Sequence, residues 1–287
     1  MTKIREKLLQ YPIVAAILLM LFYVIFLVAP VAIIFLIIRP DTHMMRAFLY
    51  VTISSCFMFL LWFIVVPYGF HLPKGKLQTF KEYIEVLHLN KFRPAMFNIG
   101  LGVCCAMVVL ISSLLTTILF ADYIFDINRN LPPNSWAVLI AIVPGFWEEV
   151  AFRGVLLALF LRRYSEKTAI FLDALFFSIM HLTNLIGREI TDLTLVYVGS
   201  QLVYTFFAGL FFAYMLVKTS SLIPCIITHY MVDAFIGIFT YATSVDPYLF
   251  AVLDAILGSG ALPAIINILL IKKLSKHYEL SKINYQK

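Results

Sequence analysis

Two adjacent glutamates and an arginine interrupt an apolar run in the segment PGFWEEVAFRG. Glu149 and Arg153 are four residues apart, so on a helix they share a face and can form an ion pair. Glu148 is rotated by about 100° from Glu149 and is left out of that pair. A carboxylate without a counter-ion, held away from bulk water, is a group that can serve as a general base.

Two histidines in later apolar runs could work with this carboxylate. His181 ends the motif FSIMH, and HYMVD places His229 and Asp233 four residues apart. That spacing allows the carboxylate to orient the imidazole, or allows both side chains to hold a water molecule or a metal ion. Asp173 is expected near the cytoplasmic interface and Asp254 has no partner that the sequence reveals, so we interpret both as structural.

The whole chain has the composition of a membrane protein. Of its 287 residues, 62% are hydrophobic and 13% are charged, and the mean hydropathy is +0.94. Soluble domains are about 45–50% apolar and about 25% charged. A chain of this length cannot hide so much apolar surface from water, so lipid must be its solvent.

Apolar runs of about 20 residues, enough to cross a ~30 Å hydrocarbon core, recur along the chain. They predict an all-α, polytopic membrane helix bundle with about eight transmembrane helices. The first run is too long for a signal-peptide core and no small-residue cleavage site follows it, so we expect a retained helix. The predicted spans are 11–38, 46–69, 96–121, 136–161, 168–187, 193–217, 220–242 and 248–271.

Lys and Arg are divided unevenly between the loops on the two sides of these spans. Of the 22, the two termini and the alternate loops carry 17, the remaining loops carry 4, and the last is Arg153. Cytoplasmic loops hold the excess of basic residues, so we expect both termini to be cytoplasmic. The net charge of +6 then reflects topology and attraction to anionic lipid, and we expect no nucleic-acid partner.

The polar residues of different helices lie at similar predicted depths. At about 1.5 Å per residue, Glu148 is roughly 18 Å from the outer end of its helix. His181 and His229 are roughly 20 Å and roughly 14 Å from the cytoplasmic ends of theirs. Such agreement between distant segments is what one converging site requires.

Three further features concern the chain outside these motifs: a short amphipathic segment, the division into domains and the cysteines. Segment 77–89 has apolar residues at helical spacing, and either a short helix on the cytoplasmic membrane face or an ordinary loop helix fits it. We divide the chain into N-terminal helices with this segment (1–122), a catalytic core (136–242) and a last helix with a basic tail (243–287). The cysteines all lie in apolar runs and are expected to be small buried residues: Cys56, Cys104, Cys105 and Cys225.

The three motifs together resemble the CAAX-protease and bacteriocin-processing family, also called the Abi family, of intramembrane metalloproteases. Its members carry EExxxR on one helix, FxxxH on the next and HxxxN or a close variant further on. EEVAFR, FSIMH and HYMVD match this pattern in order and spacing, over roughly residues 136–242. The resemblance implies an α-helical bundle of about eight helices around a cavity, and an intramembrane endopeptidase. The matched site residues are Glu148, Glu149, Arg153, His181, His229 and Asp233.

The resemblance also implies roles for these residues. Glu148 would activate water with help from His181, while His229 and residue 233 would stabilise the oxyanion. This chain has Asp233 where the family more often has Asn, and an ionised carboxylate cannot donate a hydrogen bond to an oxyanion. Asp233 is therefore protonated, or orients His229, or takes part in binding a cation.

The use of a metal stays open at this point. The family is described as metalloprotease, yet two histidines with carboxylates can also work without metal. HExxH, the spacing that would make zinc nearly certain, is absent. We favour the metal-free hypothesis, and the alternative is a divalent cation such as zinc. Its candidate ligands are Glu148, His181, His229 and Asp233.

Three classes of function were compared. The leading hypothesis is an endopeptidase that cleaves a membrane-associated peptide or protein, as in CAAX-type or bacteriocin-processing and self-immunity proteases. The alternative is a non-hydrolytic membrane partner that regulates a sensor kinase or gives bacteriocin immunity. A transporter is disfavoured because the polar residues cluster and no inverted repeat is visible. Membrane lipid and the substrate are the expected partners, in the plasma membrane of a bacterium.

Overall fold

The computed structural model describes residues 2–92, 94–121, 136, 138–186, 188–236 and 246–277. All regular secondary structure in these residues is helical, which confirms the all-α prediction. The predicted outer loop around Arg129 and the basic tail beyond residue 277 lie outside the described residues.

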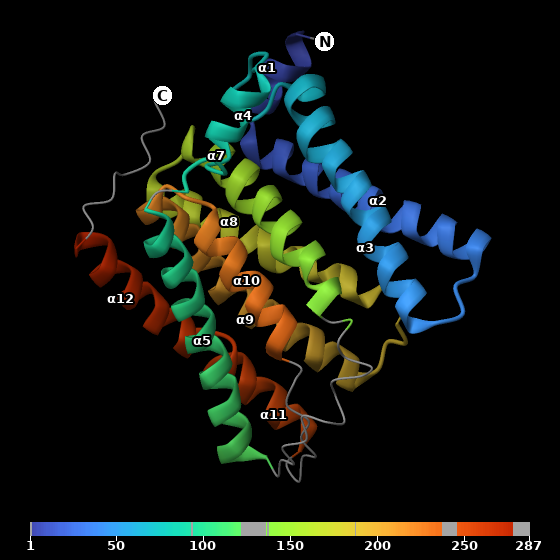
Figure 1. The fold of residues 1–287 in the computed structure, drawn as a ribbon, viewed down its shortest axis with the longest axis vertical. Coiled ribbons are helices and arrows are strands. Elements are labelled where there is room, and N and C mark those ends of the chain that lie inside the picture. Colours follow the sequence, from blue (N-terminus) through green and yellow to red (C-terminus); the bar gives the residue numbers. More distant parts are fainter. Residues whose placement is uncertain are drawn as a thin grey trace.

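Each predicted span corresponds to a helical stretch of chain (Figure 1). Among the described residues, six helices are long and apolar enough to cross a membrane, and a shorter apolar helix, α10, accompanies them. The fourth predicted span is helical through residues 138–161 apart from a turn at residue 141. The elements are α1 (Thr2–Gln10), α2 (Pro12–Ile38), α3 (His43–Phe59), η1 (Leu60–Phe70), α4 (Phe80–Val86), α5 (Ala95–Phe120), η2 (Val143–Glu148), η3 (Val150–Leu156), α7 (Leu157–Leu161), α8 (Glu166–Met180), η4 (His181–Leu185), α9 (Asp192–Thr219), α10 (Ile223–Phe235), α11 (Pro247–Leu253), η6 (Asp254–Gly258) and α12 (Ala261–His277).

Local sequence signals set where several helices begin and end. Pro12 occupies the first turn of α2, where its missing N–H costs nothing. Thr42, Ser165 and Thr191 precede α3, α8 and α9, and each side chain accepts a hydrogen bond from a backbone N–H in the first turn. Such caps stabilise a helix by about 1 kcal/mol each. Ser220, with a left-handed φ of 52°, ends α9 and lets the chain turn back into α10.

The loops that the charge count assigns to the cytoplasmic side meet at one end of the bundle. Figure 1 shows α1 and α4 together at this end. The Arg162 side chain donates a hydrogen bond to the Lys74 carbonyl at 3.1 Å, and His88 Nδ1 lies 3.0 Å from the Ser220 carbonyl oxygen. The sequence therefore grouped these loops correctly. Which side of the membrane they face stays a prediction.

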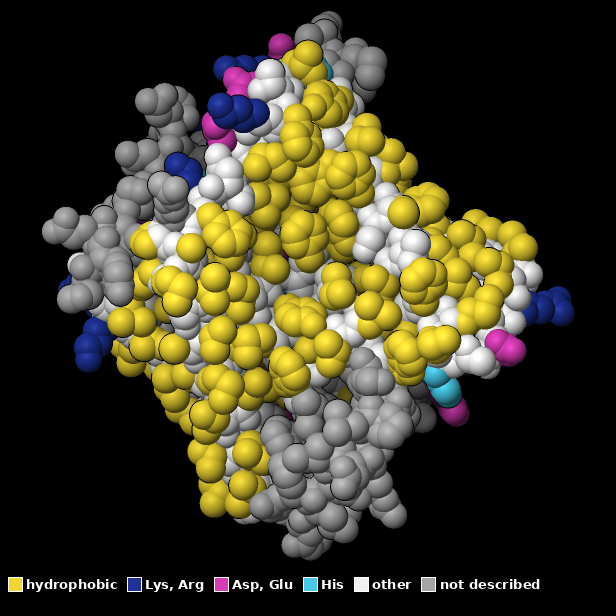
Figure 2. Space-filling model, viewed as in Figure 1, with side chains coloured by type: hydrophobic (Ala, Val, Ile, Leu, Met, Phe, Trp, Pro, Cys, Tyr) yellow, Lys and Arg dark blue, Asp and Glu magenta, His cyan; other side chains and the backbone are white. Residues whose placement is uncertain are grey.

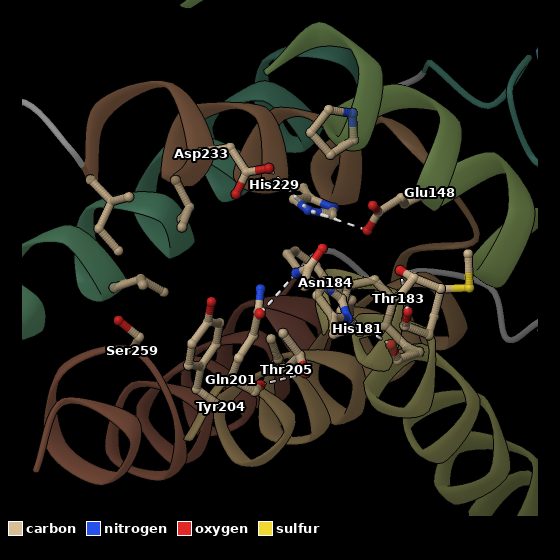
Figure 3. Close-up of a pocket in the computed structure, with 18 of the residues that line it drawn as sticks. Glu148, His181, Thr183, Asn184, Gln201, Tyr204, Thr205, His229, Asp233 and Ser259 are labelled. Carbon is tan, nitrogen blue, oxygen red and sulfur yellow. Dashed lines mark hydrogen bonds and ion pairs between the residues drawn. The ribbon is translucent and has the colours of Figure 1, made fainter. Parts of the chain in front are cut away.

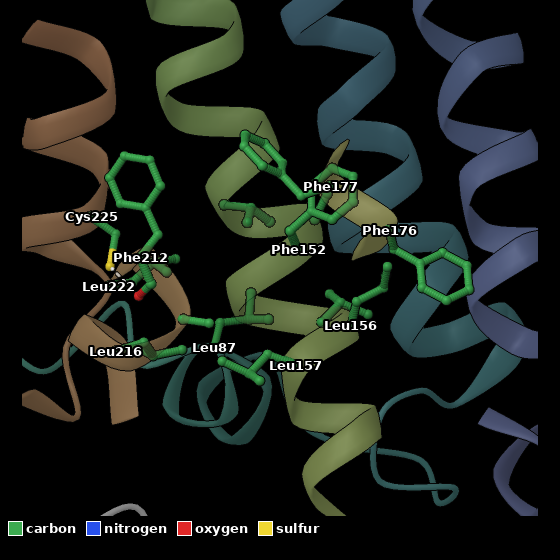
Figure 4. Close-up of a cluster of buried hydrophobic side chains, with 14 of the residues drawn as sticks. Leu87, Phe152, Leu156, Leu157, Phe176, Phe177, Phe212, Leu216, Leu222 and Cys225 are labelled. Carbon is green, nitrogen blue, oxygen red and sulfur yellow. Dashed lines mark hydrogen bonds between the residues drawn. The ribbon is translucent and has the colours of Figure 1, made fainter. Parts of the chain in front are cut away.

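Segment 77–89 forms the short helix α4, which is capped by Thr79 and packs into the bundle. The Tyr83 hydroxyl donates to the Trp62 carbonyl at 2.7 Å. Leu87 is fully buried, and Figure 4 shows it among the apolar side chains of the helices around it. It can approach closely because Gly154 has no side chain there. Tyr83, Val86 and Leu87 thus pack on protein while Phe80 stays half exposed, which favours the loop-helix interpretation over a helix lying on lipid.

The fourth span differs from the regular α-helix that we expected. Its turns are wide and π-helical in η2 and η3, on both sides of Glu149. Pro144, which has no N–H for the helical ladder, lies in the first of them. Gly145 there lies against the backbone of Tyr230, where an added Cβ would come within 2.7 Å of the Tyr230 Cα. Wide turns of this kind are frequent at functional sites.

The outer surface is apolar, as lipid contact requires. Hydrophobic side chains cover most of the described face in Figure 2, and the charged ones lie at its edges. The expectation that all cysteines are buried is wrong for this reason. Cys105 and Cys225 are buried, but Cys56 and Cys104 are exposed on the bundle surface. In a membrane protein an apolar run does not by itself indicate burial.

Candidate active site

A cavity of about 390 Å³ lies among the helices. Its lining comes from both halves of the chain, including α2, α3, η2, η4, α9, α10 and η6. In Figure 3, Glu148 and Asp233 lie on one side of the cavity, across from Gln201 and Tyr204. Four of the predicted site residues line the cavity, namely Glu148, His181, His229 and Asp233.

Glu148 is the carboxylate that borders the cavity. Its side chain is 16% exposed, and its Oε2 atom lies 3.9 Å from Nε2 of His229. That oxygen has no hydrogen-bond partner among the described residues. Its position agrees with the prediction that Glu148 is free of the Glu149–Arg153 pair, and the residue lines the cavity.

Glu149 and Arg153 form the predicted ion pair, at 3.2 Å and fully buried. Arg153 also lies 3.4 Å from a carboxylate oxygen of Asp173, which is itself fully buried. The guanidinium carbon sits 4.1 Å from the centre of the Phe177 ring. Asp173, which we interpreted as structural, is carried by α8 directly onto the arginine. Asp173 is a second counter-ion for Arg153.

His229 is held in place through its Nδ1 atom, which lies 2.7 Å from Oε1 of Glu149. An ionised carboxylate only accepts hydrogen bonds, so Nδ1 carries the proton and donates it. The ring stacks on Phe212 with centroids 5.4 Å apart. Nε2 then faces Glu148 and Asp233, with Oδ2 of Asp233 at 3.5 Å. Glu149 thus holds Nδ1 of His229, while Asp233 lies near the other ring nitrogen.

His181 reaches the same cavity from η4. Its Nδ1 donates to the Phe177 carbonyl at 2.8 Å, and Phe177 also contacts the ring edge-on at 5.1 Å. This bond leaves Nε2 as the free nitrogen. Phe177, the first residue of the FSIMH motif, thus packs against His181, Arg153 and His229 together. The structure describes no direct contact between His181 and Glu148.

Sequence reasoning missed several polar residues of the cavity. Tyr23 and Tyr50 enter from α2 and α3, two helices in which no functional residue was expected. Asp254 lines the far end and accepts hydrogen bonds from Ser113 at 3.4 Å and Ser259 at 3.1 Å. Tyrosine is uncharged at neutral pH, so it does not stand out in an apolar run as Asp, Glu, Arg and His do. A count of all hydrogen-bonding side chains in apolar runs would have included them.

The donor set was compared with the needs of a metal ion. Among the described residues, no three or more His, Cys, Asp or Glu side chains are grouped so as to hold one. A catalytic zinc ion usually has three protein ligands and an open position. The described residues do not supply such a set.

Residues 130–235 match the family model for the type II CAAX prenyl endopeptidase Rce1-like family. This range contains η2, α8 and α10, and so all three motifs and Asp173. Comparisons with curated proteins and with solved structures gave no match. Residues 130–235 therefore form an Rce1-like domain, and the resemblance to the CAAX-protease and bacteriocin-processing family that the motifs predicted is confirmed.

Proposed function

We propose that this protein is an intramembrane endopeptidase that hydrolyses a peptide bond of a membrane-associated peptide or protein. The main support is the contrast between two neighbouring carboxylates. Glu149 is buried and engaged by Arg153 and His229. Glu148 borders the cavity with an oxygen that has no hydrogen-bond partner among the described residues. One glutamate holds the site together and the other is available for chemistry.

In the proposed reaction Glu148 acts as general base. It takes a proton from a water molecule, whose oxygen attacks the peptide carbonyl carbon and forms a tetrahedral intermediate. The carbon–nitrogen bond then breaks, and Glu148 returns the proton to the leaving amine. His181 helps to hold the water through its free Nε2. A positioned general base contributes about 10²- to 10⁴-fold to such a rate.

His229 and Asp233 are proposed to stabilise the oxyanion. Because Nδ1 of His229 donates to Glu149, a protonated imidazole presents its second N–H at Nε2, toward the cavity. Asp233 in its protonated form donates a further hydrogen bond, as the amide of the commoner Asn would. Fixed donors of this kind are worth about 10²–10³ in rate each. The proposal needs no metal ion.

The substrate is expected to reach the cavity from the bilayer, because the bundle surface around it is apolar. The matched family is described as a prenyl endopeptidase of CAAX type. CAAX-type trimming would release a short C-terminal peptide, whereas bacteriocin-type processing would cut an apolar peptide elsewhere. Mass spectrometry of the products separates these two classes by the position of the cleavage.

The test compares Glu148→Gln with the wild type. Cells producing each protein are analysed for membrane peptides, and a precursor found in this way is then cleaved by purified protein in detergent. We expect Glu148→Gln to lower the cleavage rate about a hundredfold or more, because the amide cannot accept the proton from water. Its melting temperature should stay close to that of the wild type, since Oε2 of Glu148 has no hydrogen-bond partner among the described residues and its ion pair with His229 is long, at 3.9 Å.

Two results would argue against the proposal. An unchanged peptide pattern with Glu148→Gln would favour the non-hydrolytic membrane partner instead. Adding a chelator to the wild-type protein tests separately whether the endopeptidase works without a metal ion. We expect no loss of activity, and a loss that zinc restores would contradict it.

A further inference from the structure

Two tyrosines from the N-terminal helices form part of the cavity wall. Tyr23 lies on α2 and Tyr50 on α3, and both line the cavity that contains Glu148. Both tyrosines lie outside the matched range 130–235, so the family match assigns them no role.

The Tyr23 hydroxyl is buried without a hydrogen-bond partner among the described residues. The side chain is only 2% exposed, and its ring packs near Trp62 with centroids 6.1 Å apart. Most buried polar groups in proteins are hydrogen-bonded, so an unpaired hydroxyl beside a cavity needs an explanation. A partner that enters the cavity would supply one.

Other polar side chains of the cavity already have partners. Asn184 donates to the Gln201 side chain at 2.8 Å. Thr183 donates to the Met180 carbonyl at 2.8 Å, and Thr205 donates to the Gln201 carbonyl at 2.6 Å. Tyr23 differs from these three in having a hydroxyl donor with no partner among the residues that the structure describes.

We propose that the Tyr23 hydroxyl binds a backbone carbonyl oxygen of an extended peptide substrate, next to Glu148. The inference rests on the proposed function. A helical peptide satisfies its own carbonyl groups, whereas an extended one in a water-poor cavity needs donors from the protein. Glu148 in its basic form only accepts hydrogen bonds and cannot serve a carbonyl oxygen. The first helices of the chain thus supply substrate binding to a catalytic centre built by the later ones.

The test is Tyr23→Phe, which removes the hydroxyl and keeps the ring. The matched control is Tyr83→Phe, because the Tyr83 hydroxyl is also buried but donates to the Trp62 carbonyl away from the cavity. Cleavage is measured on a precursor whose processing depends on Glu148. We expect Tyr23→Phe to lower kcat/KM about 3- to 10-fold, mainly through a higher KM, as the loss of one neutral hydrogen bond predicts.

Of the two variants, Tyr83→Phe should lose more stability although Tyr23→Phe should lose more activity. Tyr23→Phe removes an unpaired polar group, so its melting temperature should equal or exceed that of the wild type. Tyr83→Phe leaves a buried carbonyl unpaired, so it should melt at a lower temperature and keep the wild-type KM. A KM for Tyr23→Phe equal to that of the wild type would overturn the inference while leaving the peptidase intact. The absence of any Glu148-dependent product would overturn both.

Discussion

At the scale of single residues, the site is organised by one buried guanidinium. Arg153 lies between Glu149 and Asp173 and under the Phe177 ring, with no exposure to solvent. Burying such charges is costly unless they are paired, so the guanidinium can be buried only because its counter-ions are buried with it. Glu149 in turn fixes His229. Arg153 therefore holds Glu149 in place, and Glu149 holds the imidazole of His229.

Glu149→Gln should destabilise the protein much more than Glu148→Gln. The neutral amide weakens the bond to Arg153 and the bond to His229 together. We expect a loss of about 3 kcal/mol, the low end for breaking a buried pair, because Asp173 still pairs with Arg153. Activity should fall as well, since His229 loses its orientation. The free energy of unfolding is measured by titrating a denaturant into the detergent-solubilised protein.

The control for this comparison is Glu166→Gln. Glu166 also forms an ion pair, with Lys218 at 3.0 Å, but it lies at the surface with 44% of its side chain exposed. Exposed pairs contribute about 0–1 kcal/mol. If Glu149→Gln cost no more than Glu166→Gln, the buried network would not be a source of stability.

At the scale of elements, the distance between η2 and α10 decides whether Glu148 and His229 meet. Gly145 allows the close approach because an added Cβ would lie 2.7 Å from Cα and 2.9 Å from the backbone N of Tyr230, the neighbour of His229. Backbone atoms cannot move aside as the end of a flexible side chain can. The glycine therefore sets the separation of η2 and α10.

Gly145→Ala should push α10 away from the glutamates. We expect a loss of stability of about 1–3 kcal/mol from overpacking and a fall in activity of about 10- to 100-fold from misplaced groups. Gly100→Ala is the control, since nothing lies within 4 Å of an added Cβ on that exposed turn of α5. Alanine there should stabilise by about 0.5–1 kcal/mol and keep full activity. Equal effects of the two substitutions would show that the contact between η2 and α10 is not tight.

At the scale of the whole molecule, the bundle is an integral membrane protein with its basic loops at one end. The 17-to-4 division of Lys and Arg predicts that this end is cytoplasmic. The predicted plasma-membrane location and the orientation of the termini depend on this charge argument. They call for a direct measurement.

Cysteine labelling tests the orientation in a variant that lacks the four natural cysteines, two of which are exposed. A membrane-impermeant maleimide should react in intact cells at Asn128→Cys and Ser244→Cys, which lie in the predicted outer loops and outside the described residues. Lys76→Cys should react only after the membrane is opened. The reverse pattern would invert the topology and place the basic loops outside.

The sequence by itself determined the class of protein, the succession of helices and four of the side chains that line the cavity. These follow from local properties, because the length of an apolar run and the cost of a charge inside it depend little on the rest of the fold. The i, i+4 spacing of Glu149 and Arg153 likewise belongs to one helix, and their ion pair formed as predicted.

Only the tertiary structure decided how these residues are paired. The bond between Glu149 and His229 joins residues 80 positions apart, and the partners of Asp173 and Asp254 also come from other helices. Tyr23 reaches the cavity from a helix whose sequence is apolar throughout. Such contacts depend on which faces of which helices meet, and that is set by packing details such as the missing side chain at Gly145. Hydropathy along a single helix says little about them, because the faces that meet lipid and those that meet other helices are both largely apolar.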